Sequence, residues 1–405
     1  MHRSRVLFLA LSAVLVIPIL AGSLLRAAQR DESPKEDSFY RYLAVFSEVL
    51  GLVKQAYVDE PDMTALMSGA LDGTTDALDP FSIYVPADGV ATYQEARNVG
   101  WRHSGIALLK ERGVAYVVAV EQGSPGGEAG VKVGDIVAQV DERSTRTMPL
   151  WEIQELLARP AGTKVKLELV RVGETVKAEF DLKAFDAPPA RLERLEQGVT
   201  LLRIPNFDKD MVPQVRAALD QAARPAGANG VVAGSTAGRL LIDLRGVASG
   251  DAEVAYGVAR LFVDGELGVL ADRNATLQSY TGGDKPLWQG KTVVLVDRGT
   301  LGAAEVLATV LRQKGGAELV GERTFGHAGR QGSADLSNGG RLLFTDAFYT
   351  GPDKQPIDES LKPDLVVDER TRTFIEKDVP LGELILQRGV QRLLGTDGET
   401  AKKAA

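Results

Sequence analysis

Residues 292–320 read TVVLVDRGTLGAAEVLATVLRQKGGAELV, and this stretch decides the class of the fold. An apolar run at 292–297 predicts a buried strand, and helical spacing follows at 303–314. A second apolar run begins at residue 317. A strand, a helix and another strand in this order predict two parallel strands joined by a crossover helix.

The same alternation precedes this unit. Strands are predicted at 199–204 and 239–245, and helices at 209–222 and 251–262. Together these elements predict a layered α/β domain with a largely parallel sheet over residues 186–380. The Gly- and Ala-rich stretch 225–238 is predicted to be an exposed loop. An amphipathic helix at 381–394 and a polar tail end the chain.

Residues 99–185 follow a different pattern. Short β-rich runs alternate with Gly and Pro, and one helix at 149–157 interrupts them. The predicted strands are 113–120, 135–141, 163–172 and 175–182. This pattern predicts a compact, mostly β module, separated by Pro188 and Pro189 from the α/β domain. Before it, apolar spacing predicts helices at 40–57 and 63–78 within a helical region at 31–98.

The first 30 residues differ from the rest of the chain, since they hold four arginines and no acidic residue. An uncharged run occupies residues 6–25. It is longer than the core of a signal peptide and about the length that crosses a bilayer, so an uncleaved anchor is favoured over a cleaved signal. The basic residues before the run predict that the body lies outside the cytoplasm, on the periplasmic side.

The composition excludes several classes of function. The 405-residue chain has a net charge of -8, which argues against nucleic acid as a partner. Cysteine is absent, so thiolate catalysis, cysteine zinc sites and disulfides are excluded. Outside the leader only His103 and His327 could bind a metal through imidazole. We therefore predict neither a metal site nor a cofactor.

Residues 123–137 read GSPGGEAGVKVGDIV and resemble the GSPAxxAGLxxGDxI segment of PDZ domains. Upstream, residues 104–107 take the place of the PDZ carboxylate-binding loop. Backbone N–H groups in such a turn suit a terminal carboxylate, and the following strand edge can pair with a peptide. The implied ligand is a protein C-terminal tail with an apolar last residue, because Ile106 and Leu108 predict an aliphatic pocket. The alternative is a module that acts only as a spacer. The implied peptide-binding residues are Ser104, Gly105, Ile106 and Ala107.

A PDZ module joined to this α/β domain resembles the carboxyl-terminal processing peptidases, also called tail-specific proteases. The segments that carry the resemblance are 77–82, 202–207, 321–326 and 362–367, the last three similar to the family's YIRIxxF, GERTFGKG and GxxPDxxV patterns. The resemblance implies a crotonase/ClpP-like layered peptidase core, an inserted PDZ domain, N-terminal helices and serine-type proteolysis.

The catalytic positions depart from the family. Its nucleophile segment reads GSASASE or GTASASE, with the reactive Ser three residues before Glu and the general-base Lys 25 residues later. Here residues 299–305 read GTLGAAE, so Gly302 takes the nucleophile position and His327 the base position. The third family element is kept as Gln331. Covalent acyl transfer needs an activated hydroxyl or thiol, which glycine lacks, so we predict a pseudoenzyme.

The loop that helps to form the oxyanion hole is also altered. The family reads LDLRxNPGG, whereas residues 242–250 read IDLRGVASG and lack the Asn, the Pro and one Gly. Backbone donors at residues 302–304, the N-terminus of the helix predicted at 303–314, are predicted to persist. The corresponding oxyanion-loop positions are Ser249, Gly250 and Ala303.

Three functional hypotheses follow. The first is a non-catalytic relative that binds C-terminal tails of envelope proteins as a scaffold, competitor or regulator of an active partner. The second is an active endopeptidase in which Thr300 or Ser249 attacks and His327 is the base, oriented by Glu305. Thr300 has a simpler role as a turn or N-cap residue. The third is a homodimer through the helices at 40–78, with no PDZ ligand.

Overall fold

The structure is a computed structural model of the chain, and it describes residues 36–222, 238–283, 285–373, 376 and 378–395. The predicted anchor at 6–25, most of the predicted loop at 225–238 and the polar tail lie outside these residues. The chain forms two compact units, residues 1–69 and residues 70–405. Within the described residues, no helix has both the length and the apolar character needed to cross a bilayer.

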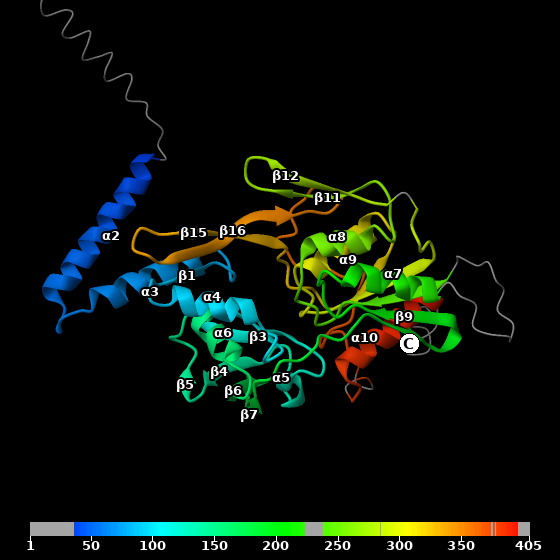
Figure 1. The fold of residues 1–405 in the computed structure, drawn as a ribbon, viewed down its shortest axis with the longest axis horizontal. Helices are drawn as coiled ribbons and strands as arrows, with labels where there is room; N and C mark the ends of the chain where they lie inside the picture. The colour runs from blue at the N-terminus through cyan, green and yellow to red at the C-terminus, as the bar shows by residue number, and fades with distance from the viewer. Residues whose placement is uncertain (1–35, 223–237, 284, 374–375, 377, 396–405) are drawn as a thin grey trace, which may run out of the picture. The chain divides into compact units, whose positions relative to one another are not determined.

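Two helices begin the described chain, α2 at Glu36–Ala56 and α3 at Met63–Asp76 (Figure 1). They confirm the helices predicted from apolar spacing. The carboxylate of Asp62 accepts hydrogen bonds from the N–H groups of Thr64 and Ala65, at 2.9 and 3.1 Å, and so caps the start of α3. Much of the apolar surface of α2 is exposed; Tyr40, for example, is 68% exposed.

The β-rich module is one sheet with the strand order β2-β3-β4-β6-β7, and β5 pairs with β4. Helix α6 packs against it, and the short helix α5 begins behind Ser124, whose hydroxyl accepts from the N–H of Gly127. These elements confirm the predicted strands and helix. Their bounds are β2 Ile106–Glu111, β3 Val114–Val120, α5 Pro125–Glu128, β4 Ile136–Val140, β5 Arg143–Ser144, α6 Leu150–Ala158, β6 Lys164–Arg171 and β7 Glu174–Asp181.

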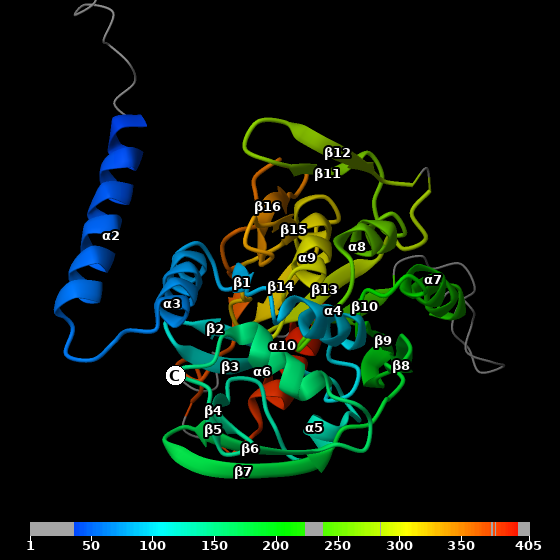
Figure 2. The ribbon, with the colours of Figure 1, turned by 60° about the vertical axis from the view of Figure 1, so that its left-hand side comes forward.

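The sequence did not predict helix α4, Val90–Val99, or strand β1, Ile83–Val85. Helix α4 lies beside α6 in both ribbon views (Figure 2). Its Tyr93 is 5% exposed and belongs to the same buried cluster as Ile106 and Leu157. Helix α4 is short and mostly polar, with few buried positions, so its sequence carries only a weak helical pattern.

The α/β domain contains a sheet with the order β17-β14-β13-β10-β9-β8, in which all pairs are parallel except β8 with β9. The predicted, largely parallel sheet is therefore confirmed. Its strands are β8 Arg191–Arg194, β9 Val199–Arg203, β10 Arg239–Asp243, β13 Lys291–Val296, β14 Glu318–Gly321 and β17 Leu365–Val366.

Alternate residues of these strands face two different layers of helices. Ile242 and Val294 belong to the buried cluster that includes α7, α8 and α9, whereas Leu241 and Leu295 pack with α10. Figures 1 and 2 show α10, in red, away from α8 and α9. Because successive side chains of a strand point to opposite faces, helices cover both faces of the sheet and form a helix–sheet–helix sandwich. The helices are α7 Met211–Ala222, α8 Ala252–Ala259, α9 Ala303–Gln313 and α10 Leu381–Leu394.

A second, antiparallel sheet was not predicted. Its order is β1-β16-β11-β12, and β15 pairs with β16. Strand β1 follows the N-terminal helices and pairs with β16, so this sheet joins distant parts of the chain. The remaining strands are β11 Glu266–Ala271, β12 Thr276–Thr281, β15 Gly329–Asp335 and β16 Arg341–Tyr349.

Candidate functional site

Gly302 lies in the turn between β13 and α9. Its backbone has φ +60° and ψ -111°, a conformation that L side chains rarely adopt. Its N–H donates a 3.0 Å hydrogen bond to Oε2 of Glu305. A Cβ placed here would meet only the carbonyl oxygen of His327 within 4 Å, at 3.8 Å. Position 302 therefore has room for a Cβ, although its backbone conformation is strained for any residue other than glycine.

The carboxylate of Glu305 fixes the start of α9 to the segment before β15. Glu305 is fully buried and accepts hydrogen bonds from the N–H groups of Gly302, Gly326 and His327, at 3.0, 2.6 and 2.9 Å. It also accepts one from the Thr324 hydroxyl. Burial raises the pKa of Glu305, and the four hydrogen bonds oppose that rise. The carboxylate thus holds the two catalytic positions of the family in one rigid arrangement.

The imidazole of His327 does not contact Glu305. It stacks on Phe81 with ring centroids 4.1 Å apart, and Phe348 meets its face edge-on at 5.3 Å. Its Nε2 lies 3.2 Å from Oγ1 of Thr345. A base–orienter pair of His327 with Glu305 is therefore not formed, because the carboxylate accepts from the backbone N–H of His327 instead, in line with a Glu that belongs to the helix packing the site.

Gly329 makes space for this position of the imidazole. A Cβ on Gly329 would lie 2.6 Å from Nε2 of His327 and 2.6 Å from Cγ2 of Thr345. Burial lowers the pKa of His327, while Asp79 and Asp358 oppose the change. The imidazole is therefore neutral near pH 7 and able to accept a proton.

Of the three positions that the sequence assigns to the catalytic machinery of the family, only Gln331 keeps the family residue. It lies opposite Thr345 in the β15–β16 pair. Its Nε2 donates a 2.7 Å hydrogen bond to the backbone oxygen of Phe81. Gln331 therefore holds the segment that covers His327, and its side-chain hydrogen bond goes to that segment and not to the imidazole.

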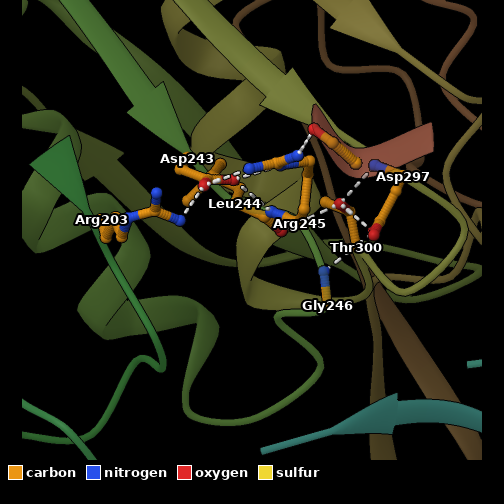
Figure 3. A network of polar contacts seen from close by, with 8 residues as sticks. Arg203, Asp243, Leu244, Arg245, Gly246, Asp297 and Thr300 are labelled. Carbon is orange, nitrogen blue, oxygen red and sulfur yellow. Dashed lines mark hydrogen bonds and ion pairs between the residues drawn. The ribbon is translucent and has the colours of Figure 1, made fainter. Parts of the chain in front are cut away.

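Thr300 is buried and its hydroxyl is committed to the fold (Figure 3). Oγ1 donates to the carbonyl of Leu244 at 2.9 Å and accepts from the N–H of Asp297 at 2.9 Å. These contacts agree with the predicted turn role. The N-cap of α9, however, is Gly302 and not Thr300. No hydrogen bond joins Thr300 to His327 within the described part of the chain.

An ionic network supports the same strand ends (Figure 3). Asp243, at the end of β10, is 6% exposed and accepts from Arg203 at 2.8 Å and from Arg245 at 2.7 Å. Arg245 also donates to the carbonyl of Gly382 at the start of α10. The network ties β9, β10 and α10 together beneath the altered loop at 246–250.

Ser249 and Gly250 are held by the backbone of Phe207. The N–H of Phe207 donates to the Ser249 carbonyl at 3.0 Å, and a Cβ on Gly250 would lie 2.3 Å from the Phe207 carbonyl carbon. The Oγ of Ser249 is buried and has no hydrogen-bond partner among the described residues. Neither predicted relocated hydroxyl is therefore brought to His327. Ala303 is the first residue of α9, where a helical N–H has no partner within the helix, so it stays a candidate oxyanion donor.

The PDZ loop at 104–107 borders a cavity of about 350 Å³. Ile106, Ala107 and Leu108 form one side of it, and the core residues Ser249 and Gly250 form another. Ser104 is fully buried and also lines the cavity. Gly105 has φ +71°, and a Cβ there would lie 1.9 Å from that of Ser124, so this position requires glycine.

Sequence reasoning missed Phe81, Gly329 and Thr345 at this site. Phe81 lies in a segment that was assigned to the family's N-terminal region, and Gly329 lies two residues after His327. The sequence contains no signal for their contacts, because the contacts join the N-terminal segment, a loop and β16 through tertiary packing.

Comparison with known proteins agrees with this architecture. The profile of peptidase family S41 matches residues 198–367, and that of the PDZ domain matches residues 116–171. The carboxy-terminal processing protease CtpA of Bacillus subtilis (strain 168) is 26% identical over 370 residues, 88% of this chain and 75% of that protein.

The carboxyl-terminal-processing protease of Synechocystis sp. (strain ATCC 27184 / PCC 6803 / Kazusa) is 30% identical over 299 residues, 72% of this chain and 67% of that protein. The solved structure of the photosystem II D1 C-terminal processing protease shares the fold, with a TM-score of 0.63 and 24% identity over 87% of this chain and 97% of that one. The chain therefore belongs to the carboxyl-terminal processing peptidases of family S41 and carries a PDZ domain.

Proposed function

We propose that this protein is a non-catalytic member of its family that binds the C-terminal tails of other proteins. One observation carries the proposal. Position 302, where the family has its attacking Ser, is a glycine whose N–H binds Glu305 at the start of α9. The base position is a His whose ring stacks on Phe81, meets Phe348 at a steep angle and is hydrogen-bonded to Thr345. Acyl transfer through a covalent intermediate needs a nucleophile and a base that act together.

The PDZ cavity supports tail binding. Its walls include the aliphatic side chains of Ile106, Leu108 and Leu157, which suit an apolar last residue. Among the described strands β2 pairs only with β3, so its other edge has no strand partner, and residues 106–108 of β2 border the cavity. PDZ domains bind extended tails at such an edge. The substrate class of the family, a protein C-terminus, is thus retained here as a ligand.

The sequence of the N-terminus supports a location for this activity. A basic start and the uncharged run at 6–25 favour export with an anchor in the inner membrane. In this proposal the ligands are tails of envelope proteins. The protein acts there as a scaffold, a competitor or a regulator of an active peptidase.

Two measurements on the full-length protein in mild detergent test the proposal. Quenched fluorogenic peptides with aliphatic C-terminal residues report hydrolysis, and fluorescence polarisation of labelled peptides reports binding. We expect saturable binding without turnover. Turnover that persists through repeated purification and disappears in His327→Ala would refute the non-catalytic reading. Absence of binding to every peptide would refute tail recognition.

The alternative function is an active endopeptidase with a relocated nucleophile. One contact favours it, because the Thr345 hydroxyl lies 3.2 Å from Nε2 of His327, and a hydroxyl next to a neutral imidazole is the arrangement that activates a nucleophile. Thr300 and Ser249, the hydroxyls predicted for this role, make no such contact among the described residues. Labelling by a serine-reactive phosphonate probe that is lost in Thr345→Val would support this alternative.

Self-association remains a third proposal. Apolar side chains of α2 are exposed within the first unit, Phe39 to 60% and Leu52 to 57%. A second copy could cover them, as a homodimer through the N-terminal helices. Sedimentation of the full-length protein in detergent, compared with a variant carrying Leu52→Glu and Val45→Glu, would detect a concentration-dependent dimer that the charges abolish.

A further inference from the structure

The cavity beside the PDZ loop has walls from three parts of the second unit. The PDZ module contributes its loop, β2 and α6, helix α4 contributes Tyr93 and Arg97, and the core contributes Ser249 and Gly250. Its volume of about 350 Å³ lies at the lower end of the range for ligand pockets, about 300–1,000 Å³. A space of this size suits the end of a chain and not an extended segment.

The charge of the lining favours an anion. Among the described residues that border the cavity, Arg97 is the one with a charged side chain, and none is acidic. Arg97 is exposed, and its guanidinium, which is hydrogen-bonded to the side chain of Tyr93, lies at the cavity rim. A polypeptide C-terminus combines an anionic group with a side chain that the aliphatic wall can accept.

The PDZ loop has already used some of its donors. The N–H of Gly105 donates to the carbonyl of Trp101 at 2.6 Å. The N–H of Ile106 donates to the hydroxyl of Ser104 at 3.3 Å, a long hydrogen bond that a carboxylate could replace. The loop alone therefore offers a terminal carboxylate fewer free donors than the sequence suggested.

The hydroxyl of Ser249 is a further hydrogen-bond donor beside the cavity. Its Oγ has no hydrogen-bond partner among the described residues, whereas buried polar groups of native proteins normally have one. Neighbouring atoms cover this Oγ in the free protein, so the hydroxyl has to turn about the Cα–Cβ bond to meet a ligand in the cavity that Ser249 lines. The position of its backbone is fixed, because the N–H of Phe207 donates to the Ser249 carbonyl and the Phe207 backbone packs directly against Gly250. The family loop has Gly at this position, so the hydroxyl is a feature of this chain.

We propose that Ser249 is a ligand-binding residue whose hydroxyl donates to the terminal carboxylate of a bound tail, so that the core and the PDZ loop hold the tail end from opposite sides. The proposal rests on the tail-binding function proposed above and names a residue for it. The degenerate catalytic loop then serves recognition in place of chemistry.

Helix α4 sets the length of tail that is recognised. It packs against α6, and its Tyr93 is buried among Ile106 and Leu157, where a longer peptide would lie between β2 and α6. We therefore expect recognition to be confined to the last few residues. A tripeptide and a decapeptide with the same C-terminus should bind with dissociation constants that differ less than about threefold.

The test uses the full-length protein and labelled decapeptides that differ only in their last residue, Ala, Val, Leu, Ile or Asp. The best binder is also made as its carboxamide and as a tripeptide. The variants are Ser249→Ala, Ser249→Gly and Thr309→Val. Thr309 is the matched control, because its hydroxyl is likewise buried without a partner but does not line the cavity.

We expect Ser249→Ala and Ser249→Gly each to raise the dissociation constant about ten- to a hundredfold, as for a hydrogen bond to a charged group. Thr309→Val should leave it unchanged. Ser249→Ala should not lower the melting temperature of the free protein, because the hydroxyl makes no internal bond to lose. Ser249→Gly should lower it slightly, because glycine adds conformational freedom to the unfolded chain. The carboxamide should bind as weakly to wild type as the acid binds to Ser249→Ala.

The outcomes separate the two proposals. If the acid binds wild type and the Ser249 variants equally well, the assignment of Ser249 fails while tail binding stands. If Ser249→Ala lowers the melting temperature so far that unfolded protein explains the lost binding, Ser249 has a structural role, and its assignment as a ligand-binding residue also fails. If no peptide binds wild type, both proposals fail together.

Discussion

The ring of His327 stacks on the ring of Phe81, with centroids 4.1 Å apart and an angle of 20° between the planes. Phe81 is itself held by Gln331, which binds its carbonyl oxygen. The residue at the base position of the family is thereby covered by a segment that precedes the PDZ domain. This contact leads to the first of four predictions.

Phe81→Ala should raise the pKa of His327, because burial lowers it and removal of the ring admits water. The chain has three histidines, so imidazole proton resonances can be followed by NMR as a function of pH. His103 serves as the internal control, since its Nδ1 contacts the carbonyl of Arg159 at a separate place. An unchanged His327 titration in Phe81→Ala would contradict this account of the pKa.

Gly302→Ser should lower the free energy of unfolding by about 1–3 kcal/mol, the cost of a side chain at a positive φ. Urea denaturation measures it, and Gly302→Ala should cost a similar amount, since both add a Cβ. We also expect no peptide hydrolysis by Gly302→Ser alone, because His327 is bonded to Thr345. Measurable turnover in this single variant would show that the imidazole is free to act as a base.

Glu305→Gln should destabilise the protein by about 3 kcal/mol or more, because an amide cannot accept all four hydrogen bonds and places a donor against donors. Urea denaturation would measure the loss. The exposed Glu95→Gln on α4 is the control, with an expected change within about 0.5 kcal/mol. Equal stability of the two variants would mean that the carboxylate does not organise the turn.

Glu121→Gln should stabilise the protein at pH 8 and not at pH 5. Glu121 is 7% exposed, and burial, together with the nearby Asp208, raises its pKa to about 7. The folded state therefore keeps a proton that the unfolded state releases near pH 4.5, and stability is lost as the pH rises through 7.

The neutral amide of Gln removes this loss, so we expect the free energy of unfolding of Glu121→Gln to exceed that of wild type by about 2 kcal/mol at pH 8. Melting temperatures of both proteins at pH 5 and pH 8 provide the measurement. Because the change in His327 protonation is common to both proteins, it cancels in the comparison. A gain of equal size at both pH values would indicate a packing effect in place of a titration.

The sequence predicted the parallel sheet because its strands and helices have strong, regular patterns. Val293 and Leu295 alternate with Val294 and Val296 in a strand buried on both sides, and the predicted bounds of α10, residues 381–394, were those observed. The second sheet escaped prediction for a physical reason. Strand β15 is mostly polar and its partner β16 is mixed, so neither shows the clean alternation of a half-buried strand.

At the site, the sequence assigned Gly302 and His327 to catalytic positions of the family but could not predict what their side chains or backbones contact. These assignments follow from the spacing of the two residues from Glu305, and the structure places both backbones around the Glu305 carboxylate. The position of the imidazole beside Phe81 and Thr345 depends on the packing of distant segments. No spacing rule along the chain encodes such packing.

The four hydrogen bonds to Glu305 have a consequence for recognition kinetics. They order the start of α9 and the segment at 324–327 during folding, before any tail arrives. Binding of a tail at the PDZ cavity therefore does not have to order these two segments, and no binding free energy is lost in ordering them. Differences in affinity among tails should accordingly reside mainly in how slowly each one leaves.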